Sequence, residues 1–356
     1  MADTKPNNDH WSPDQPQDWT GVFGEPDTGV GDKAQPDDGG DAPKIPNGAM
    51  PLRPLKVGEV LGVSWQITRK SFRAVFGIAG TAAAIVGTIE LVVLVTLLRL
   101  YPESTSLGAV LAELFASGAT PNQSQLTAIF EDALPGVASA LMGFALLQVA
   151  AFLCVAIIAH VVAGSVIAKP VSATGAWRAT RGRTFSLIAL LVLSTLLIVA
   201  AFAVPVTIAL TTSALLGDSA LSATLFGVGL GVSLVLGVIT FLRLLLAPVA
   251  LTLEGASVRK SILRSNELVR KSGWRVFWVY FLGSLLANAV ALLVSFPFVV
   301  LSGDTTVISS QSVFFNTAGS IVNYLVVLAF VSVVLGVLYT ELRIRKENLA
   351  AALKKA

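Results

Sequence analysis

Six long apolar runs follow one another between residues 74 and 340, and they restrict the possible folds more than any other feature of the sequence. A hydrocarbon core about 30 Å thick is crossed by a helix of about 20 apolar residues. Apolar residues make up 54% of the chain and charged residues only 13%, which is unlike soluble domains. The sequence therefore predicts an all-α, polytopic membrane bundle, with spans at about 74–99, 137–168, 185–216, 223–251, 276–301 and 318–340.

The first fifty residues have a different composition, with ten acidic residues against three lysines and seven prolines. Such a segment cannot bury enough apolar surface to offset its chain entropy, so residues 1–50 are predicted to be a disordered tail. Trp11, Trp19 and Phe23 are either solvated aromatic residues or a short motif for a protein partner. No secretory signal peptide is recognised, so the first apolar helix is expected to direct membrane insertion. A membrane domain at 51–346 and a short tail at 347–356 complete the expected organisation.

The distribution of Lys and Arg predicts the orientation, because cations resist translocation. Twenty of them lie in the segments 51–73, 169–184, 252–275 and 341–356, whereas the opposite segments contain only Arg99. Both termini are therefore expected to be cytoplasmic. A cationic cytoplasmic face favours anionic lipid headgroups by about 1 kcal/mol per cation. Nucleic acid is not an expected partner, because no reader motif is present.

Three short segments resemble one another and precede successive pairs of spans. They read W-Q-I-T-R-K-S-F-R at 65–73, W-R-A-T-R-G-R-T-F at 177–185 and N-E-L-V-R-K-S-G-W at 266–274, and they align on Arg69, Arg181 and Arg270. The bundle is thus expected to consist of three helical hairpins, each preceded by a basic interfacial segment, arising by repetition or by compositional chance. Such segments place aromatic rings and basic stems at the headgroups, either to position the spans or to sense lipid. The candidate interface residues are Trp65, Arg69, Lys70, Arg73, Trp177, Arg181, Arg183, Arg270, Lys271 and Trp274.

Three ionisable residues fall within the apolar runs, where charge is costly and is a default sign of function. Helical rise places His160 and Arg243 at one depth and Glu90 about 10 Å further from the cytoplasm, so an ion pair between Glu90 and Arg243 is not expected. Glu90 is either a structural residue, satisfied by Asn288, Asn323 or Gln148, or a proton site for transport. His160 is expected to be a hydrogen-bonded interior residue. Arg243 either reaches toward Glu254 or a lipid phosphate, or binds substrate.

Helix breakers lie within the spans, and common catalytic motifs are absent from the sequence. Pro205 and Pro248 are expected to interrupt spans three and four. The chain has no phosphate-binding loop, no nucleophile elbow and no H-E-x-x-H motif, and its only histidines are His10 and His160. Cys154 is the single cysteine. We therefore expect no metal, no cofactor and no enzymatic activity.

Four stretches resemble the glycerophosphoryl diester phosphodiesterase membrane-domain family. They are P-L-R-P-L-K-V-G-E-V-L at 51–61, R-L-L-L-A-P-V-A-L-T-L-E at 243–254, R-S-N-E-L-V-R-K-S-G-W-R-V-F at 264–277 and L-Y-T-E-L-R-I-R-K-E at 338–347. The resemblance covers about residues 51–350, and the chain is similar to the six-span actinobacterial members of the family. It marks Arg243, Pro248 and Glu254 as motif positions without giving them a chemical role. The catalytic domain that follows the membrane domain in some members has no room here, so the resemblance implies no phosphodiesterase activity.

Together these observations predict a non-enzymatic protein of a bacterial plasma membrane, linked to lipids or the cell envelope. Its expected role is that of a membrane scaffold or accessory subunit. The alternative is a transporter or lipid-handling permease whose interior cavity is bounded by Glu90, His160 and Arg243. An intramembrane enzyme would need a polar cluster reachable from one membrane face.

Overall fold

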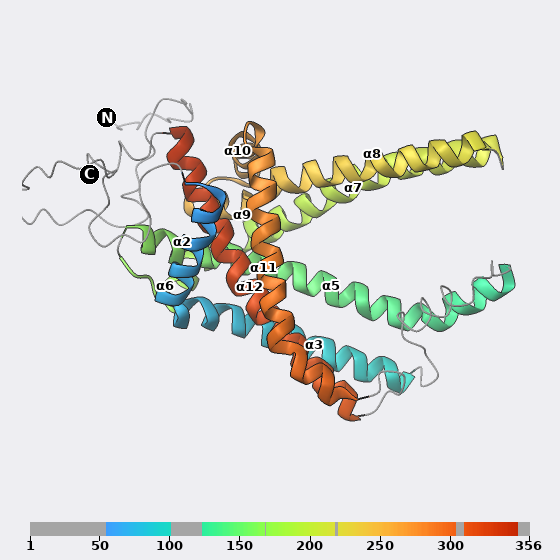
Figure 1. Ribbon diagram of the computed structural model, residues 1–356, viewed down its shortest axis with the longest axis horizontal. Helices are drawn as coiled ribbons and strands as arrows, with labels where there is room; N and C mark the ends of the chain where they lie inside the picture. Colours follow the sequence, from blue (N-terminus) through green and yellow to red (C-terminus); the bar gives the residue numbers. More distant parts are fainter. Residues whose placement is uncertain (1–54, 101–122, 168, 218–219, 304–309, 348–356) are drawn as a thin grey trace, which may run out of the picture.

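The computed structural model of the protein describes residues 55–100, 123–167, 169–217, 220–303 and 310–347 (Figure 1). Helices account for almost all of these residues, and no strand occurs among them. The predicted tail at 1–50 lies outside the described residues. The helices are α2 (Val57–Lys70), α3 (Phe72–Leu100), α5 (Gln123–Val166), α6 (Ala173–Arg181), α7 (Thr184–Leu216), α8 (Ala220–Leu244), α9 (Ala247–Leu253), α10 (Val258–Arg270), α11 (Gly273–Ser302) and α12 (Ser310–Glu347).

Six of the helical segments are long and apolar enough to cross a membrane, which confirms the predicted fold class. They are Phe72–Leu97, Leu141–Val166, Thr184–Leu216, Ala220–Leu253, Gly273–Ser302 and Gln311–Lys346. Five agree with the predicted spans to within a few residues at each end. The sixth extends further at both ends than the predicted 318–340, because α12 continues as one helix into the charged sequence that follows Thr340.

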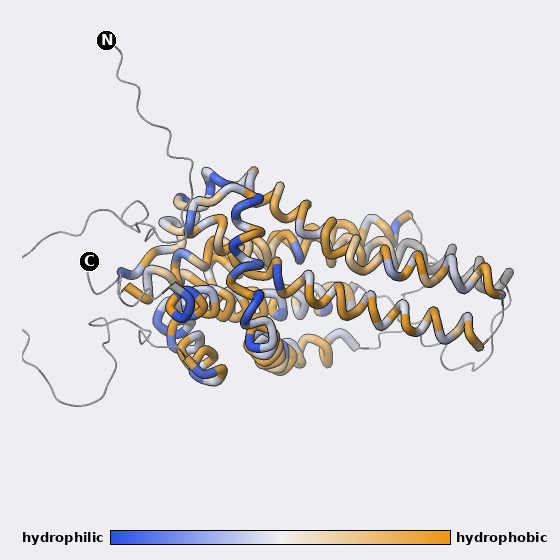
Figure 2. Tube along the Cα trace, turned by 90° about the horizontal axis from the view of Figure 1, so that it is seen from above, coloured by the Kyte–Doolittle hydropathy of each residue, from blue (hydrophilic) through white to orange (hydrophobic). Residues whose placement is uncertain are grey.

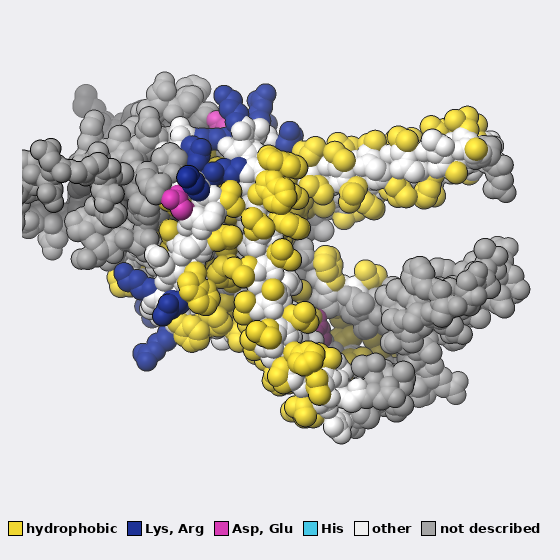
Figure 3. Space-filling view, viewed as in Figure 1, with side chains coloured by type: hydrophobic (Ala, Val, Ile, Leu, Met, Phe, Trp, Pro, Cys, Tyr) yellow, Lys and Arg dark blue, Asp and Glu magenta, His cyan; other side chains and the backbone are white. Residues whose placement is uncertain are grey.

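Polar side chains gather at one end of the bundle. The short helices α2, α6, α9 and α10 lie there, and the long helices project away from them (Figure 1). Hydrophilic residues concentrate at the same end of the chain trace (Figure 2), and groups of Lys and Arg side chains lie at its surface (Figure 3). We call this region, formed by α2, α6, α10 and the adjoining ends of the long helices, the basic end. Its composition matches the cationic face that the sequence predicts.

Helix α12 is the centre of the packed core. It contacts α11, α3, α5 and α2, and its buried side chains belong to the main hydrophobic cluster. On α12 the buried apolar residues recur along nearly four turns, from Leu328 to Leu342. Among membrane helices such burial stabilises the bundle through close packing rather than through removal of apolar surface from water.

The hairpin of α7 and α8 is attached to the rest of the molecule only near the basic end. The two helices pack against each other along their length. No described residue between 191 and 240 belongs to either hydrophobic cluster, whereas Leu187, Leu190 and Leu242 do. Apolar side chains cover the flanks of the projecting part in the view of Figure 3. Most of this hairpin therefore exposes its apolar surface.

The two prolines predicted to interrupt spans behave differently. Helix α7 continues through Pro205, so the prediction of a break there is wrong. A proline inside a membrane helix is tolerated because neighbouring groups and small local adjustments can satisfy the carbonyl that it frees. Pro248 follows a real break, because α8 ends at Leu244 and α9 begins at Ala247.

Candidate functional site

The three basic segments share one local structure. In each, a short helix ends at or just after the aligned arginine, and a long helix begins three residues after it. The long helices start at Phe72, Thr184 and Gly273, after Arg69, Arg181 and Arg270 respectively. The alignment made from nine-residue segments therefore holds in the backbone, and each hairpin has the same entry: amphipathic helix, short break, spanning helix.

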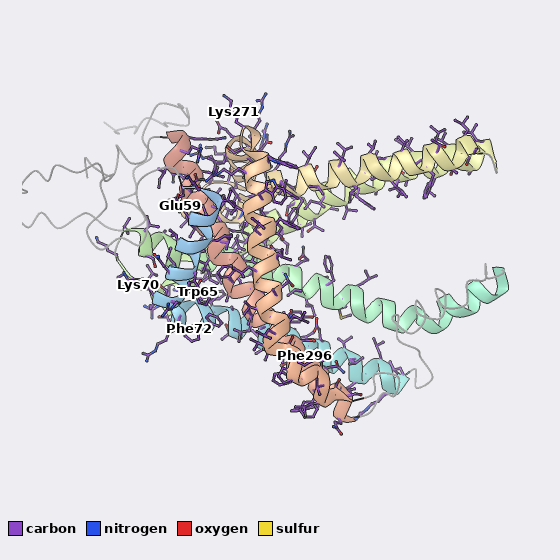
Figure 4. All side chains as sticks on the ribbon, viewed as in Figure 1. Glu59, Trp65, Lys70, Phe72, Lys271 and Phe296 are labelled. Carbon is purple, nitrogen blue, oxygen red and sulfur yellow. The ribbon has the colours of Figure 1, made fainter. Side chains whose placement is uncertain are left out.

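Nine of the ten candidate interface residues are exposed at the basic end, as an interfacial role requires. Trp65 and Trp177, which occupy equivalent positions four residues before the aligned arginines, are 52% and 48% exposed. Trp65, Lys70 and Phe72 lie at the surface of the basic end in Figure 4. Trp65, Gln66, Arg69 and Lys70 also line a shallow hollow. These side chains present cations and an aromatic ring at the surface, as an interfacial role requires.

Arg183 differs from the other nine because it is half-buried and bound by the protein. Its Nη1 donates a hydrogen bond to the carbonyl oxygen of Leu251 at 2.9 Å. Gly255, which follows α9 with a φ of +65°, leaves room for this guanidinium, since a Cβ there would lie 2.6 Å from an Arg183 nitrogen. Arg183 thus joins the start of α7 to the end of α9.

A buried group of charges lies where α9, α10 and α12 meet. Glu254 Oε1 lies 3.1 Å from Arg264 Nε and 3.7 Å from Arg343 Nη1, and it accepts a hydrogen bond from the Tyr339 hydroxyl. The Glu254 and Arg343 side chains are only 4% and 5% exposed. Such a desolvated carboxylate needs these partners, because an unpaired buried charge costs several kcal/mol.

A second buried carboxylate lies two residues further along α12 than Tyr339. Glu341, whose side chain is fully buried, pairs with Arg275 and Arg345, each at 3.0 Å. Arg275 also donates to the backbone carbonyl of Leu55, and Arg345 lies 3.5 Å from the same oxygen. The chain just before α2 is thereby fixed to α11 and α12.

These contacts form one region that we call the buried charge cluster, defined by Glu254, Arg264, Arg275, Tyr339, Glu341, Arg343 and Arg345. All four stretches quoted for the family resemblance contribute to it, at Leu55, Glu254, Arg264 with Arg275, and the segment from Tyr339 to Arg345. Sequence reasoning identified Glu254 but treated Arg343 and Arg345 as tail cations. The available signal was the i, i+4 pair of Glu341 and Arg345, which is typical of a continuing helix.

Arg243 and Pro248 are associated with the break between α8 and α9. The Arg243 side chain is exposed, and Glu254 is bound by other arginines rather than by Arg243. The backbone carbonyl of Arg243 accepts a hydrogen bond from the Ser265 hydroxyl of α10 at 2.6 Å. Helix α8 ends at Leu244, so the carbonyls of its last turn lack partners within the helix. Ser265 compensates by binding a carbonyl near the break.

His160 is a buried residue of α5 that faces the backbone. Its Nδ1 donates to the carbonyl oxygen of Ala156 at 3.3 Å, and the Thr252 hydroxyl of α9 lies 3.3 Å from the same oxygen. The interior, hydrogen-bonded role expected from the sequence agrees with this geometry.

Glu90 lies in a different part of the bundle, between α3, α5 and α12. Its two carboxylate oxygens lie 3.1 and 3.3 Å from the hydroxyl of Tyr324, which donates to them. None of the partners proposed from the sequence (Asn288, Asn323 and Gln148) makes this bond. Tyr324 is adjacent to Asn323, but the helical phase of α12 turns the tyrosine, not the asparagine, toward Glu90. The carboxylate lines a cavity of about 280 Å³.

The structure does not bring Glu90, His160 and Arg243 together around one cavity. Only Glu90 lines the cavity between α3, α5 and α12, while His160 is buried against α9 and Arg243 is exposed. Among the residues that the structure describes, no group of three or more His, Cys, Asp or Glu could hold a metal ion. No protein family, curated protein or solved structure matches this chain.

Proposed function

We propose that this protein is a non-enzymatic scaffold or accessory subunit of a bacterial plasma membrane, with the basic end on the cytoplasmic side. The observation that carries the proposal is the contrast between its two halves. The buried charge cluster ties the ends of several helices together, while the α7–α8 hairpin projects with its apolar surface uncovered beyond residue 191.

A basic end held together by buried ion pairs, with a hairpin projecting from it, suits a protein that holds other membrane components. Among membrane helices the association energy comes from close packing and hydrogen bonds rather than from the hydrophobic effect. A helix pair that its own chain leaves uncovered is therefore a surface on which the spans of a partner or ordered lipids can pack. The exposed cations at the basic end supply a second contact, with anionic headgroups.

This proposal is tested by purifying the full chain from its native membrane in a mild detergent and weighing it by native mass spectrometry. We expect a partner of defined stoichiometry, or a fixed number of retained anionic lipids. A bare chain under conditions that preserve other membrane complexes would count against a scaffold role.

A second candidate function is a lipid-handling permease or transporter, and the cavity at Glu90 favours it. A carboxylate beside a cavity within the membrane is a common feature of substrate and proton sites. This function would be supported if vesicles that contain the purified protein transport a substrate and lose that transport on Glu90→Gln. Equal transport by the two forms would exclude a role for Glu90 in it.

A further inference from the structure

The cavity at Glu90 has the composition of a ligand site on the side of the bundle away from the basic end. Glu90 lies about 27 Å along α3 from its start at Phe72, by helical rise. The cavity of about 280 Å³ is lined from α3, α5 and α12. That volume is close to the lower limit for small-molecule sites. It holds a headgroup or small molecule rather than a whole lipid.

Several polar groups of the cavity wall are hydrogen-bond acceptors. Among the described residues, the Glu90 carboxylate receives one donor, from Tyr324, and an ionised carboxylate has room for about four. Asn316 uses its amide nitrogen on the carbonyl of Ser312, and Ser320 uses its hydroxyl on the carbonyl of Asn316. The Asn316 side-chain oxygen and the Ser320 lone pairs are therefore left to accept, on the same face of α12 as Tyr324. A wall rich in acceptors fits a ligand rich in donors.

The charge of the cavity selects a single positive charge. Glu90 is its one carboxylate among the described lining residues, and none of these residues is Lys, Arg or His. A divalent metal ion would require several oxygen ligands with more negative charge. The rest of the wall is largely apolar and includes Val93, Leu94 and Leu146. An apolar wall beside one carboxylate suits a cation that has an alkyl part.

The rim of the cavity on α5 opens toward the surface that faces lipid. Met142 and Phe144 line the cavity and are nevertheless exposed. An alkyl chain can therefore leave the cavity between the helices without losing its apolar surroundings. Gly143, between these two residues, leaves room for the carboxylate, because a Cβ there would lie 2.7 Å from Glu90 Oε1.

We propose that the cavity between α3, α5 and α12 binds a primary alkylammonium group, with Glu90 as its counter-ion and the polar face of α12 accepting its remaining N–H donors. The ammonium group belongs either to an ethanolamine-type phospholipid or to a free amine. This inference deepens the second candidate function, the permease, by naming the ligand class of its cavity.

The test measures binding of n-hexylammonium to the full chain in nanodiscs of phosphatidylcholine, which contains no primary amine. We expect saturable binding. Glu90→Gln should weaken it at least tenfold, because the charge-assisted bond to the ammonium group is lost. Tyr324→Phe should weaken it severalfold, because the Glu90 carboxylate loses the hydroxyl that orients it. Thr88→Val is the matched control, since Thr88 is exposed on the same helix and does not line the cavity. Its affinity should equal that of the wild type.

Two further arms separate the possible ligands. n-Hexanol has the same alkyl chain without the charge, and binding equal to that of n-hexylammonium would overturn the proposal. So would equal affinity of the Glu90→Gln protein. Exchange into phosphatidylethanolamine nanodiscs identifies the source: competition indicates the lipid headgroup, and undiminished hexylammonium binding indicates a free amine. Binding without transport in vesicles would sustain this site while rejecting the permease.

Discussion

At the scale of single residues, the main result is that buried charges rather than exposed ones hold the basic end together. Glu254 and Glu341 are each bonded to two arginines, and the arginines come from α10, α11 and α12. Exposed ion pairs contribute little, but removing one member of a buried group leaves the others desolvated and unpaired. The cluster is therefore sensitive to single substitutions.

Replacing Glu254 by glutamine should lower the free energy of unfolding by about 3–5 kcal/mol, because Arg264 and Arg343 lose their shared counter-ion. Titration with denaturing detergent in mixed micelles measures this difference. Glu267→Gln is the matched control, since the Glu267 side chain also pairs with Arg264 but is 58% exposed. A loss of the same size in both variants would mean that burial of the cluster is not what makes it stabilising.

Gly255 should tolerate no side chain. Its φ of +65° is unfavourable for other residues by about 1–2 kcal/mol, and a Cβ would displace Arg183 from the Leu251 carbonyl. We expect Gly255→Ala to lower the midpoint of thermal unfolding measured in detergent. Gly182→Ala serves as control, because nothing lies within 4 Å of a Cβ at that position. Equal midpoints for the two variants would contradict the role of this contact.

At the scale of elements, the three amphipathic helices form a common entry to the hairpins. The sequence was sufficient to predict a basic segment before each hairpin, because a second Lys or Arg follows the aligned arginine closely in all three. The aromatic residues are less regular, since Asn266 stands where the other two segments have Trp65 and Trp177. The structure adds that Val60, Val63 and Ile67 face the core, so that α2 is packed into the bundle as well as exposed to the interface. Helix α2 therefore both positions the first span and presents Arg69 and Lys70 outward, and Arg73 follows at the start of α3.

Neutralising the three outward cations of this first entry should reduce retention of anionic lipid. Each cation near a membrane surface contributes about 1 kcal/mol, and this attraction is screened by salt. We expect a protein with Arg69→Gln, Lys70→Gln and Arg73→Gln to leave mixed phosphatidylglycerol and phosphatidylcholine nanodiscs with fewer phosphatidylglycerol molecules, counted by native mass spectrometry. The variant Arg69→Lys, Arg73→Lys keeps the charge and should behave as the wild type. Unchanged lipid counts in the neutralised protein would assign these cations to insertion alone.

At the scale of the whole molecule, apolar run length and cation distribution were enough to predict six spans and one basic end. Both depend on the bilayer, which acts on each segment separately and so leaves a signal in local sequence. Contacts between distant segments have no such signal. The pairing of Glu254 with Arg343, and of Glu90 with Tyr324, depends on how α12 is rotated against its neighbours, and the sequence alone could not supply that rotation.

The same limit applies to the candidate site. Depth estimates predicted no ion pair between Glu90 and Arg243, but depth does not specify which face of a helix a side chain occupies. The structure places Arg243 outward and His160 against α9, so the cavity is built from Glu90 and the polar face of α12 instead. The α7–α8 hairpin was likewise predicted as two spans, but its separation from the core was not.

That separation is the basis of the proposed scaffold role, and site-specific photo-crosslinking in the native membrane tests it most directly. A photoreactive residue is placed at Leu234 or Ile208 on the hairpin, and at Leu292 or Phe296 on α11 as matched controls, since all four side chains are exposed and apolar. We predict discrete protein adducts of constant mass from the hairpin positions and none from α11. Lipid adducts alone at every position would contradict the claim that the hairpin holds a protein partner.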